Sequence, residues 1–250
     1  YLLCAIAILP QIYIIYLSFR NSKGSLFGVG YSLVNYQSAL KKKLVLASRN
    51  TLVMGIIALA VIIVIAVVLA YLVVRRNNAL NHSLDTIAML PYIMPGAVIG
   101  IALLIAYGSK PIALTGTMAI MIMSFAIRRM PYTIRSATAT LMQIPISIEE
   151  AAISLGASKL KTFVKITVPM MSNGILSGAI LSWVAIVTEL SSSVILYSNK
   201  TTTLTMQAYI YIGRGEYGTA AAFAAILTVI TALSLFLSMA ISKSEDDIQL

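Results

Sequence analysis

The sequence predicts an all-α integral membrane protein with about six transmembrane helices. Of its 250 residues, 59% are hydrophobic and 10% are charged, whereas about 25% are charged in a typical soluble domain. The hydrophobic residues gather in long runs, most of them close to the roughly 20 residues that a helix needs to cross a bilayer. A chain of this composition cannot cover itself with polar surface in water, so we expect a lipid bilayer around it.

Six segments are apolar enough to be membrane spans. They are Tyr1–Phe19, Thr51–Val74, Ile87–Tyr107, Ile112–Ile127, Ile175–Tyr197 and Thr219–Ile241. The fourth is the shortest of them. The second consists almost throughout of Val, Ile, Leu and Ala, but its 24 residues far exceed the length of a β-strand, so a helix is the better prediction.

The third span contains four residues that bend helices, namely Pro91, Pro95, Gly96 and Gly100. Such residues free backbone groups, which a membrane tolerates only where neighbouring helices satisfy them. We therefore expect this helix to be packed inside the bundle. Two interpretations stay open: a packing kink, or a moving gate at Pro95 and Gly96.

The longest polar segment between the spans is 128–174. If the spans alternate in direction, this segment shares one side of the membrane with residues 75–86 and the C-terminal tail. Residues 20–50 and 198–218 then lie on the other side. The Lys and Arg residues divide equally between the two sides, so the positive-inside rule does not orient the chain.

Residues 145–171 are too polar to span the membrane, and their pattern predicts two short helices outside it. Pro145 pushes the residue before it out of helical conformation. Ser147 stands three residues before Glu150, the spacing of a capping box, in which each side chain satisfies a free backbone N–H. Glu149 adds a second acidic group near the positive end of the helix dipole.

The first short helix, Ser147 to Leu155, is followed by Gly156, which suits the left-handed conformation that ends a helix. Ser158 can cap a second helix that runs to Pro169. Small side chains on the exposed face of the first helix allow another surface to approach closely. The helix is therefore either a connector between two spans or a docking surface.

A family resemblance favours the docking surface. Glu150-Ala151-Ala152 is followed at set spacings by Gly156, Ile166 and Pro169. This pattern resembles the EAA loop of bacterial binding-protein-dependent ABC permeases of the type I importer class, although Val168 stands where that family usually has Leu. The resemblance implies that segment 128–174 is cytoplasmic and contains the coupling helix, which seats in a groove of a separate ATPase subunit. The residues assigned to ATPase coupling are Glu149, Glu150, Ala151, Ala152, Leu155, Gly156 and Ala157.

Further matches to that family lie along most of the chain. They are Asn35-Tyr36, Asn50-Thr51-Leu52, Leu90-Pro91, Pro95-Gly96 and Met130-Pro131-Tyr132. The stretch from Glu189-Leu190-Ser191 to Tyr217-Gly218 is most similar to ferric-iron permeases and their thiamine and phosphonate relatives, which implies ferric iron as the cargo. Because ferric-iron permeases commonly carry two modules, we expect residues 1–250 to form a single permease transmembrane domain, alone or as one half of a fused chain. The apolar run at Tyr1 leads us to expect a segment before it.

The resemblance also implies partners at the bacterial cytoplasmic (inner) membrane: an ATP-binding cassette ATPase subunit, a second permease module or homologous half, and an extracytoplasmic solute-binding protein. The composition excludes other classes. The 18 Lys and Arg residues are scattered among apolar spans and form no basic face for nucleic acid. One Cys and one His leave no cluster for a metal, and no catalytic set or phosphate-binding loop is present. We expect no cofactor, and we expect ATP hydrolysis on the partner rather than on this chain.

Glu189 lies inside the fifth predicted span. A carboxylate at that depth costs a few kcal/mol unless it faces water or a partner. It is therefore either a translocation-pathway residue, together with Ser191, Ser192, Pro95 and Gly96, or a structural group that hydrogen-bonds a neighbouring helix. The rival functions are an ion- or proton-coupled secondary transporter that uses Glu189 and a scaffold that transports nothing.

Overall fold

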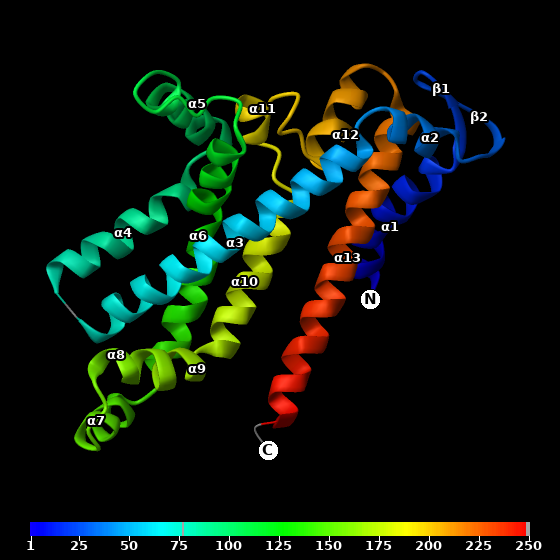
Figure 1. Ribbon diagram of the computed structural model, residues 1–250. Coiled ribbons are helices and arrows are strands. Elements are labelled where there is room, and N and C mark those ends of the chain that lie inside the picture. Colours follow the sequence, from blue (N-terminus) through cyan, green and yellow to red (C-terminus); the bar gives the residue numbers. More distant parts are fainter. Residues whose placement is uncertain (77, 249–250) are drawn as a thin grey trace.

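The computed structural model is an elongated helical bundle (Figure 1). It describes the backbone of residues 1–76 and 78–248 and the side chains of residues 1–76 and 78–237. The elements are α1 (Leu2–Ser18), β1 (Arg20–Lys23), β2 (Leu26–Tyr31), α2 (Val34–Lys41), α3 (Leu44–Arg75), α4 (Ala79–Ile93), α5 (Gly96–Tyr107), α6 (Met118–Gln143), α7 (Ile146–Ser154), α8 (Lys159–Thr162), a π-helical turn (Phe163–Thr167), α9 (Val168–Met170), α10 (Ser172–Val187), α11 (Ser193–Leu196), α12 (Leu204–Gly213) and α13 (Tyr217–Ile248).

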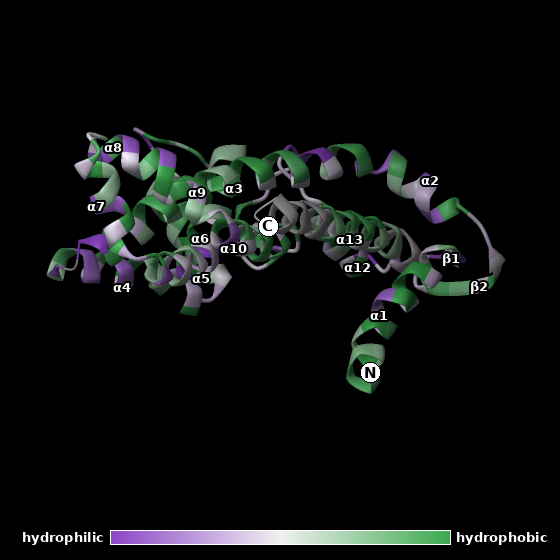
Figure 2. Cartoon of the chain, turned by 90° about the horizontal axis from the view of Figure 1, so that it is seen from below, coloured by the Kyte–Doolittle hydropathy of each residue, from purple (hydrophilic) through white to green (hydrophobic). Residues whose placement is uncertain are grey.

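The long helices α3, α6, α10 and α13 run between two ends of the bundle (Figure 1). The antiparallel β1–β2 hairpin, α2, α5, α11 and α12 lie at one end, and α7 and α8 lie at the other. Figure 2 shows that α3 and α13 are largely hydrophobic, whereas hydrophilic residues gather at α7 and α8. The predicted outer segments 20–50 and 198–218 thus lie opposite the short helices of segment 128–174.

Two helical segments are long and apolar enough to cross a membrane by themselves, α3 and residues Tyr217–Leu237 of α13. Two bent helix pairs raise the number to four in the described part of the chain if each pair is one span. The apolar helix α1 has 17 residues and is shorter than a usual span. The predicted apolar helices are therefore confirmed, whereas the number of six membrane spans stays a prediction.

The third span is not one kinked helix over Ile87–Tyr107, as the sequence predicted. It is divided into α4 and α5, which are bent by 111° relative to each other. The break falls at Met94 and Pro95, and Met94 is extended, with ψ 136°. Pro95 explains the break, because the proline ring disfavours helical conformation in the residue before it and offers no N–H to continue the ladder.

The helix in the region of the fourth predicted span, Ile112–Ile127, has other bounds, and by length and composition it is not one of the described helices that could cross a membrane. Helix α6 begins at Met118 and continues to Gln143, with Arg128, Arg129 and Pro131 inside it. Arginine is a good helix former, so Arg128 and Arg129 do not end the helix. Their ion pairs with a carboxylate offset the cost of burying their charge in the bundle interior. Only the later part of segment 128–174 is therefore a connection between long helices.

The fifth and sixth spans also differ from the prediction at their ends. Helix α10 ends at Val187 rather than at Tyr197, and a non-helical stretch separates it from α11. Helix α13 continues past the predicted end at Ile241 to Ile248, so the backbone of the expected tail is helical up to that residue. Glu189 consequently lies in a break between helices and not within one.

Helices α6 and α10 approach each other closely through small residues. A Cβ placed on Gly178 of α10 would lie 2.6 Å from the Cα of Thr133 on α6. Hydroxyl groups join the same helices: Thr133 and Ser182 lie 2.8 Å apart, and Ser136 donates to the carbonyl of Gly174 at 2.7 Å. Small residues with interhelical hydrogen bonds are the usual means of packing helices in lipid, and here they hold the bundle centre.

Candidate functional site

A buried ion-paired cluster joins the middle of α6 to the break after α10. Arg128 and Arg129 form ion pairs with the two carboxylate oxygens of Glu189, whose side chain has no exposed surface. Arg128 lies ten residues into α6, about 15 Å from the helix start at 1.5 Å per residue. We call these three residues the arginine–glutamate cluster.

Groups from the two breaks surround this cluster. The Ser192 N–H donates to the Glu189 carboxylate at 3.1 Å, and the Ser193 hydroxyl donates to the Glu189 carbonyl at 3.2 Å. On the other side, a Cβ placed on Gly96 would overlap the guanidinium of Arg128 and would lie 2.5 Å from the Cβ of Ser191. The break between α4 and α5 therefore meets the break between α10 and α11 at the cluster.

The meeting of two breaks has a physical meaning in a membrane protein. Non-helical backbone at membrane depth is tolerated where it is buried in protein or lines a water-filled path. In secondary transporters, discontinuous helices form the binding sites near the midplane. The structure thus brings together the predicted pathway residues: Pro95 and Gly96 at one break, and Glu189, Ser191 and Ser192 at the other.

The sequence interpretation missed both arginines, because it placed Arg128 and Arg129 in a polar loop. The signal that could have found them is Glu189 itself, since an acid inside the membrane needs a cationic partner. The structural interpretation of Glu189 expected a hydrogen bond to a neighbouring helix. The partners of Glu189 on another helix are the two arginines, and serine contacts come from the residues that follow it.

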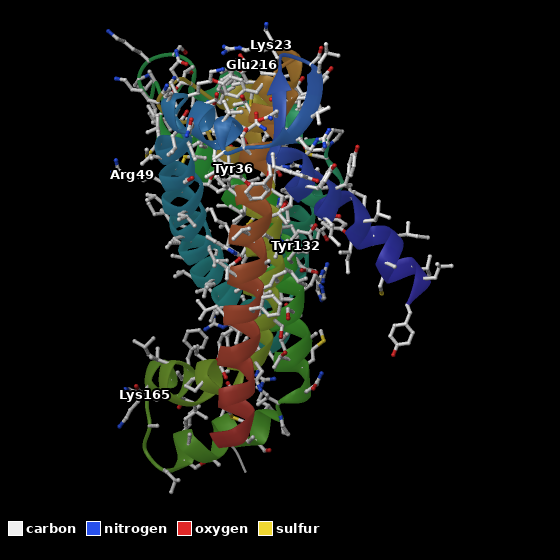
Figure 3. All side chains as sticks on the ribbon, turned by 90° about the vertical axis from the view of Figure 1, so that its right-hand side faces the viewer. Lys23, Tyr36, Arg49, Tyr132, Lys165 and Glu216 are labelled. Atoms are coloured by element: carbon white, nitrogen blue, oxygen red, sulfur yellow. The ribbon has the colours of Figure 1, made fainter. Side chains whose placement is uncertain are left out.

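A separate, mostly apolar groove lies further along α6, toward the end of the bundle that carries α7, and no residue of the cluster lines it. It has a volume of about 510 Å³ and lies between α4, α6 and α10. Its polar lining comes from Tyr132, Arg135 and Ser136, which follow Arg128 along α6 at spacings of about one and two turns. Figure 3 places Tyr132 at mid-height, between Glu216 at one end and Lys165 at the other. Arg135 donates to Asp85 on α4 at 3.2 Å.

The helix predicted to couple the chain to an ATPase corresponds to α7, which starts one residue before the predicted Ser147. Its N-cap is Pro145, and no side chain caps the helix. The capping box between Ser147 and Glu150 is therefore wrong: Ser147 lies inside the first turn, where its side chain no longer occupies the capping position. A proline suits this start because the first N–H groups of a helix have no partner within it.

The end of α7 confirms the prediction for Gly156. This glycine has φ +90°, in the left-handed region. Its N–H donates to the Ile153 carbonyl at 2.9 Å, and the Ala157 N–H donates to the Ala152 carbonyl at 3.1 Å. These two bonds form a Schellman motif, which satisfies the last carbonyls of the helix and stops it sharply.

The helix after Gly156 agrees with the prediction at its start and differs at its end. Ser158 accepts a hydrogen bond from the Lys161 N–H at 3.3 Å, so it caps α8 as expected. The helical run does not stop at Pro169. It continues through the π-helical turn to Met170, with Pro169 in its last turn.

The residues predicted for ATPase coupling divide into one buried, two half-buried and four exposed members. Glu149 binds Arg75 at 2.8 Å through the guanidinium Nε and accepts a hydrogen bond from the Tyr71 hydroxyl at 3.3 Å. Its side chain is 8% exposed, so it faces α3 rather than the surface. Ala152 and Ala157 are half-buried. The members on the exposed face are Glu150, Ala151, Leu155 and Gly156.

The Glu149→Gln variant is expected to loosen α7 from α3. Removing one partner of a buried pair leaves the other charge uncompensated, at a cost of about 3–5 kcal/mol. Hydrogen exchange of the α7 amides should therefore become at least tenfold faster. The Glu150→Gln variant is the matched control, because Glu150 is exposed and should change the exchange little. Equal exchange in the two variants would show that the Arg75–Glu149 pair does not hold the helix.

The chain was compared with known families and proteins. The family model described as "Binding-protein-dependent transport system inner membrane component" matches residues 62–244, which contain the arginine–glutamate cluster and α7. The ferric transport system permease protein FbpB of Actinobacillus pleuropneumoniae is 32% identical over 84% of this chain, but the match spans 29% of that protein. The probable transport system permease protein NifC of Clostridium pasteurianum is 33% identical over 69% of this chain and 64% of its own length.

A third relative is the molybdate/tungstate transport system permease protein WtpB of Pyrococcus furiosus, 28% identical over 83% of this chain and 82% of its own length. Among solved structures, a bacterial ABC transporter that imports the acidic polysaccharide alginate superposes with a TM-score of 0.75 and 16% identity, over 96% of this chain and 92% of that chain. The MetNI methionine ABC transporter gives a TM-score of 0.68 and 18% identity, over 84% and 97%. These structures confirm the predicted fold class.

Proposed function

Because this chain belongs to the family of binding-protein-dependent transport system inner membrane components, we propose that its two sites work as one transport device. The family is a permease component of ABC importers and not itself an enzyme. In our proposal the arginine–glutamate cluster lies on the cargo path, and α7 receives the motion of a separate ATP-hydrolysing subunit.

The observation that carries this proposal is the way α7 is fixed to the bundle. Arg75, at the end of α3, binds Glu149 on α7 and also donates to the Ile144 carbonyl at 2.9 Å, just after α6. One side chain thus ties the exposed helix to both α3 and α6. A push on α7 moves these long helices as rigid bodies and shifts Arg128 and Arg129 against the two breaks, which opens the path alternately to each side.

We propose the partners from the same comparisons. The ATPase subunit docks on the exposed face of α7, which puts that end of the bundle in the cytoplasm. A second permease module completes the path, and an extracytoplasmic solute-binding protein delivers cargo to the end with β1, β2 and α12. Residues 1–250 act as one permease domain. The chain spans about three tenths of the length of the FbpB relative, so the activity of that whole protein comes to this chain only as a proposal.

For the cargo we propose ferric iron, supported by the name of the FbpB relative. The molybdate/tungstate relative supports an oxyanion instead. The secondary-transporter alternative, with Glu189 as its ion site, has less support, because both oxygens of this carboxylate already bind arginines. A cation or a proton would have to displace those ion pairs.

Transport energetics test this proposal directly. The full-length protein is co-expressed with its candidate ATPase and binding protein and reconstituted in proteoliposomes, and uptake of ferric citrate and of molybdate is measured. We expect uptake that requires internal ATP and is unchanged by a protonophore. The probe that is taken up, ferric citrate or molybdate, identifies the cargo. Uptake driven by a proton or sodium gradient without ATP would contradict the importer and favour the secondary transporter.

A further inference from the structure

We propose that the arginine–glutamate cluster binds a compact oxygen-bearing anion, so that the cargo passes this point as an anion. This inference rests on the proposed function and names the substrate class of its site. Two sources share the required chemistry: a free oxyanion, and ferric iron held in an anionic chelate.

The cluster carries an unbalanced positive charge. Two guanidinium groups face one carboxylate, which leaves one positive charge without a partner. The side chains of Arg128 and Arg129 are only 11% and 18% exposed. Among the described residues, Glu189 is the one acid that forms an ion pair with either arginine. An unbalanced charge at membrane depth is costly, so a mobile anion is the natural counter-charge.

The two arginines of the cluster also have hydrogen-bond donors that no protein group uses. A guanidinium carries five N–H donors in a planar fork. Each arginine forms one hydrogen bond to Glu189, and the Nε of each is buried without a partner. The fork matches the oxygens of carboxylates and phosphates with two parallel hydrogen bonds, which a metal cation cannot accept. The unused donors therefore select an oxyanion.

The surroundings of the cluster offer an anion a route of entry and a route of exit. Gly96 allows the backbone of the α4–α5 break to approach Arg128 directly, and Ser191 next to it is exposed. The groove between α4, α6 and α10 begins about one turn further along α6; its lining is mostly apolar, and Arg135 is the charged residue in it. Because Asp85 pairs with Arg135, this next positive charge is balanced and holds an anion more weakly. A path must bind its cargo firmly enough to admit it and weakly enough to release it.

The same charges argue against a bare metal cation. Fe³⁺ next to two arginines meets like charges, and the one acidic group is already engaged by both guanidinium groups. Ferric iron satisfies this site only when oxygen ligands give the complex a net negative charge. The proposal therefore keeps ferric iron as a cargo and specifies its form.

Equilibrium dialysis of the purified transporter tests the proposal. The full-length permease is isolated with its ATPase and without the binding protein, and the probes are tungstate, phosphate and ferric citrate. We expect saturable binding of at least one probe by the wild type and at least tenfold weaker binding by Arg129→Gln. Lys165→Gln removes the same charge from an exposed position at the α7 end, so its dissociation constant should stay within about twofold of the wild type.

Two further variants keep the test decisive if Arg129→Gln does not fold. Arg129→Lys keeps the charge but loses the fork, so binding should be intermediate. Glu189→Gln removes the competing carboxylate and should tighten binding about tenfold, an effect that a purely structural ion pair would not give. Binding of tungstate or phosphate alone would identify a free oxyanion, and binding of ferric citrate alone would identify the chelate.

The opposite results overturn the inference. If no probe binds to the wild type or to Glu189→Gln while the ATPase co-purifies, the anion site is wrong and the importer proposal stands. Unchanged binding in a folded Arg129→Gln variant would also show that the cluster is not the anion site and would leave the importer proposal standing. If the ATPase itself is absent from the complex, the proposed function fails, and dialysis of the permease alone still decides whether the cluster binds an anion.

Discussion

Replacement of Glu189 by glutamine is expected to reduce cargo uptake at least tenfold. The variant removes both ion pairs of the cluster, and the loss of one partner of a buried pair costs about 3–5 kcal/mol. The variant leaves Arg128 and Arg129 next to each other without a carboxylate, so the two guanidinium groups repel each other. They also bind an anionic cargo too tightly to release it. Uptake per permease inserted in the membrane is the measurement.

The matched control for this prediction is Glu216→Gln. Glu216 also forms an ion pair, with Lys42, but the two side chains are 33% and 35% exposed and lie at the end with the β-hairpin. Exposed pairs contribute about 0–1 kcal/mol, so this variant should transport at the wild-type rate when the solute-binding protein is saturating. Full uptake by Glu189→Gln would contradict the pathway role and favour a purely structural role for Glu189.

The Gly156→Asp variant is expected to lower the amount of co-purified ATPase at least tenfold without reducing the amount of folded permease. A Cβ at Gly156 meets nothing within 4 Å, so the substitution fits the bundle. It strains the left-handed end of α7 by about 1–2 kcal/mol and adds a negative charge to the proposed docking face. Co-purification of the ATPase with the tagged full-length permease measures the effect.

Gly215→Asp is the control for this second prediction. Gly215 has φ +73°, and a Cβ there also meets nothing within 4 Å, but it lies between α12 and α13 at the opposite end. It imposes the same kind of strain and the same charge change. Equal loss of the ATPase from both variants would attribute the effect to strain alone and contradict docking on α7.

The parts of the fold that the sequence predicted depend on local signals. Long apolar runs such as α3 exceed any strand, so hydropathy alone identifies a helix. Gly156 ends α7 because only a residue without a Cβ adopts its conformation at no steric cost. Ser158 caps α8 through atoms that are neighbours in sequence. Each of these depends on a few consecutive residues.

The parts that were missed depend on contacts between distant residues. Arg128 and Arg129 look like the start of a loop because their hydropathy is low, but they lie within α6 and pair with Glu189, some 60 residues later. Glu149 looks like a surface residue of a short helix, yet it is buried because Arg75 lies opposite it. Hydropathy and capping rules consider residues that are close in sequence, so they do not predict ion pairs between distant residues. The cluster is therefore found only from the three-dimensional structure.

Site-specific cross-linking of α7 to the ATPase tests the central claim most directly. In a Cys4→Ser background, Leu155→Cys and Val29→Cys place single thiols on side chains that are 90% and 93% exposed, at opposite ends of the bundle. We predict that a short bifunctional reagent joins the ATPase subunit to Leu155→Cys and not to Val29→Cys. Cross-linking through Val29→Cys, or no cross-link from Leu155→Cys in a transporter that still imports its cargo, would contradict the account.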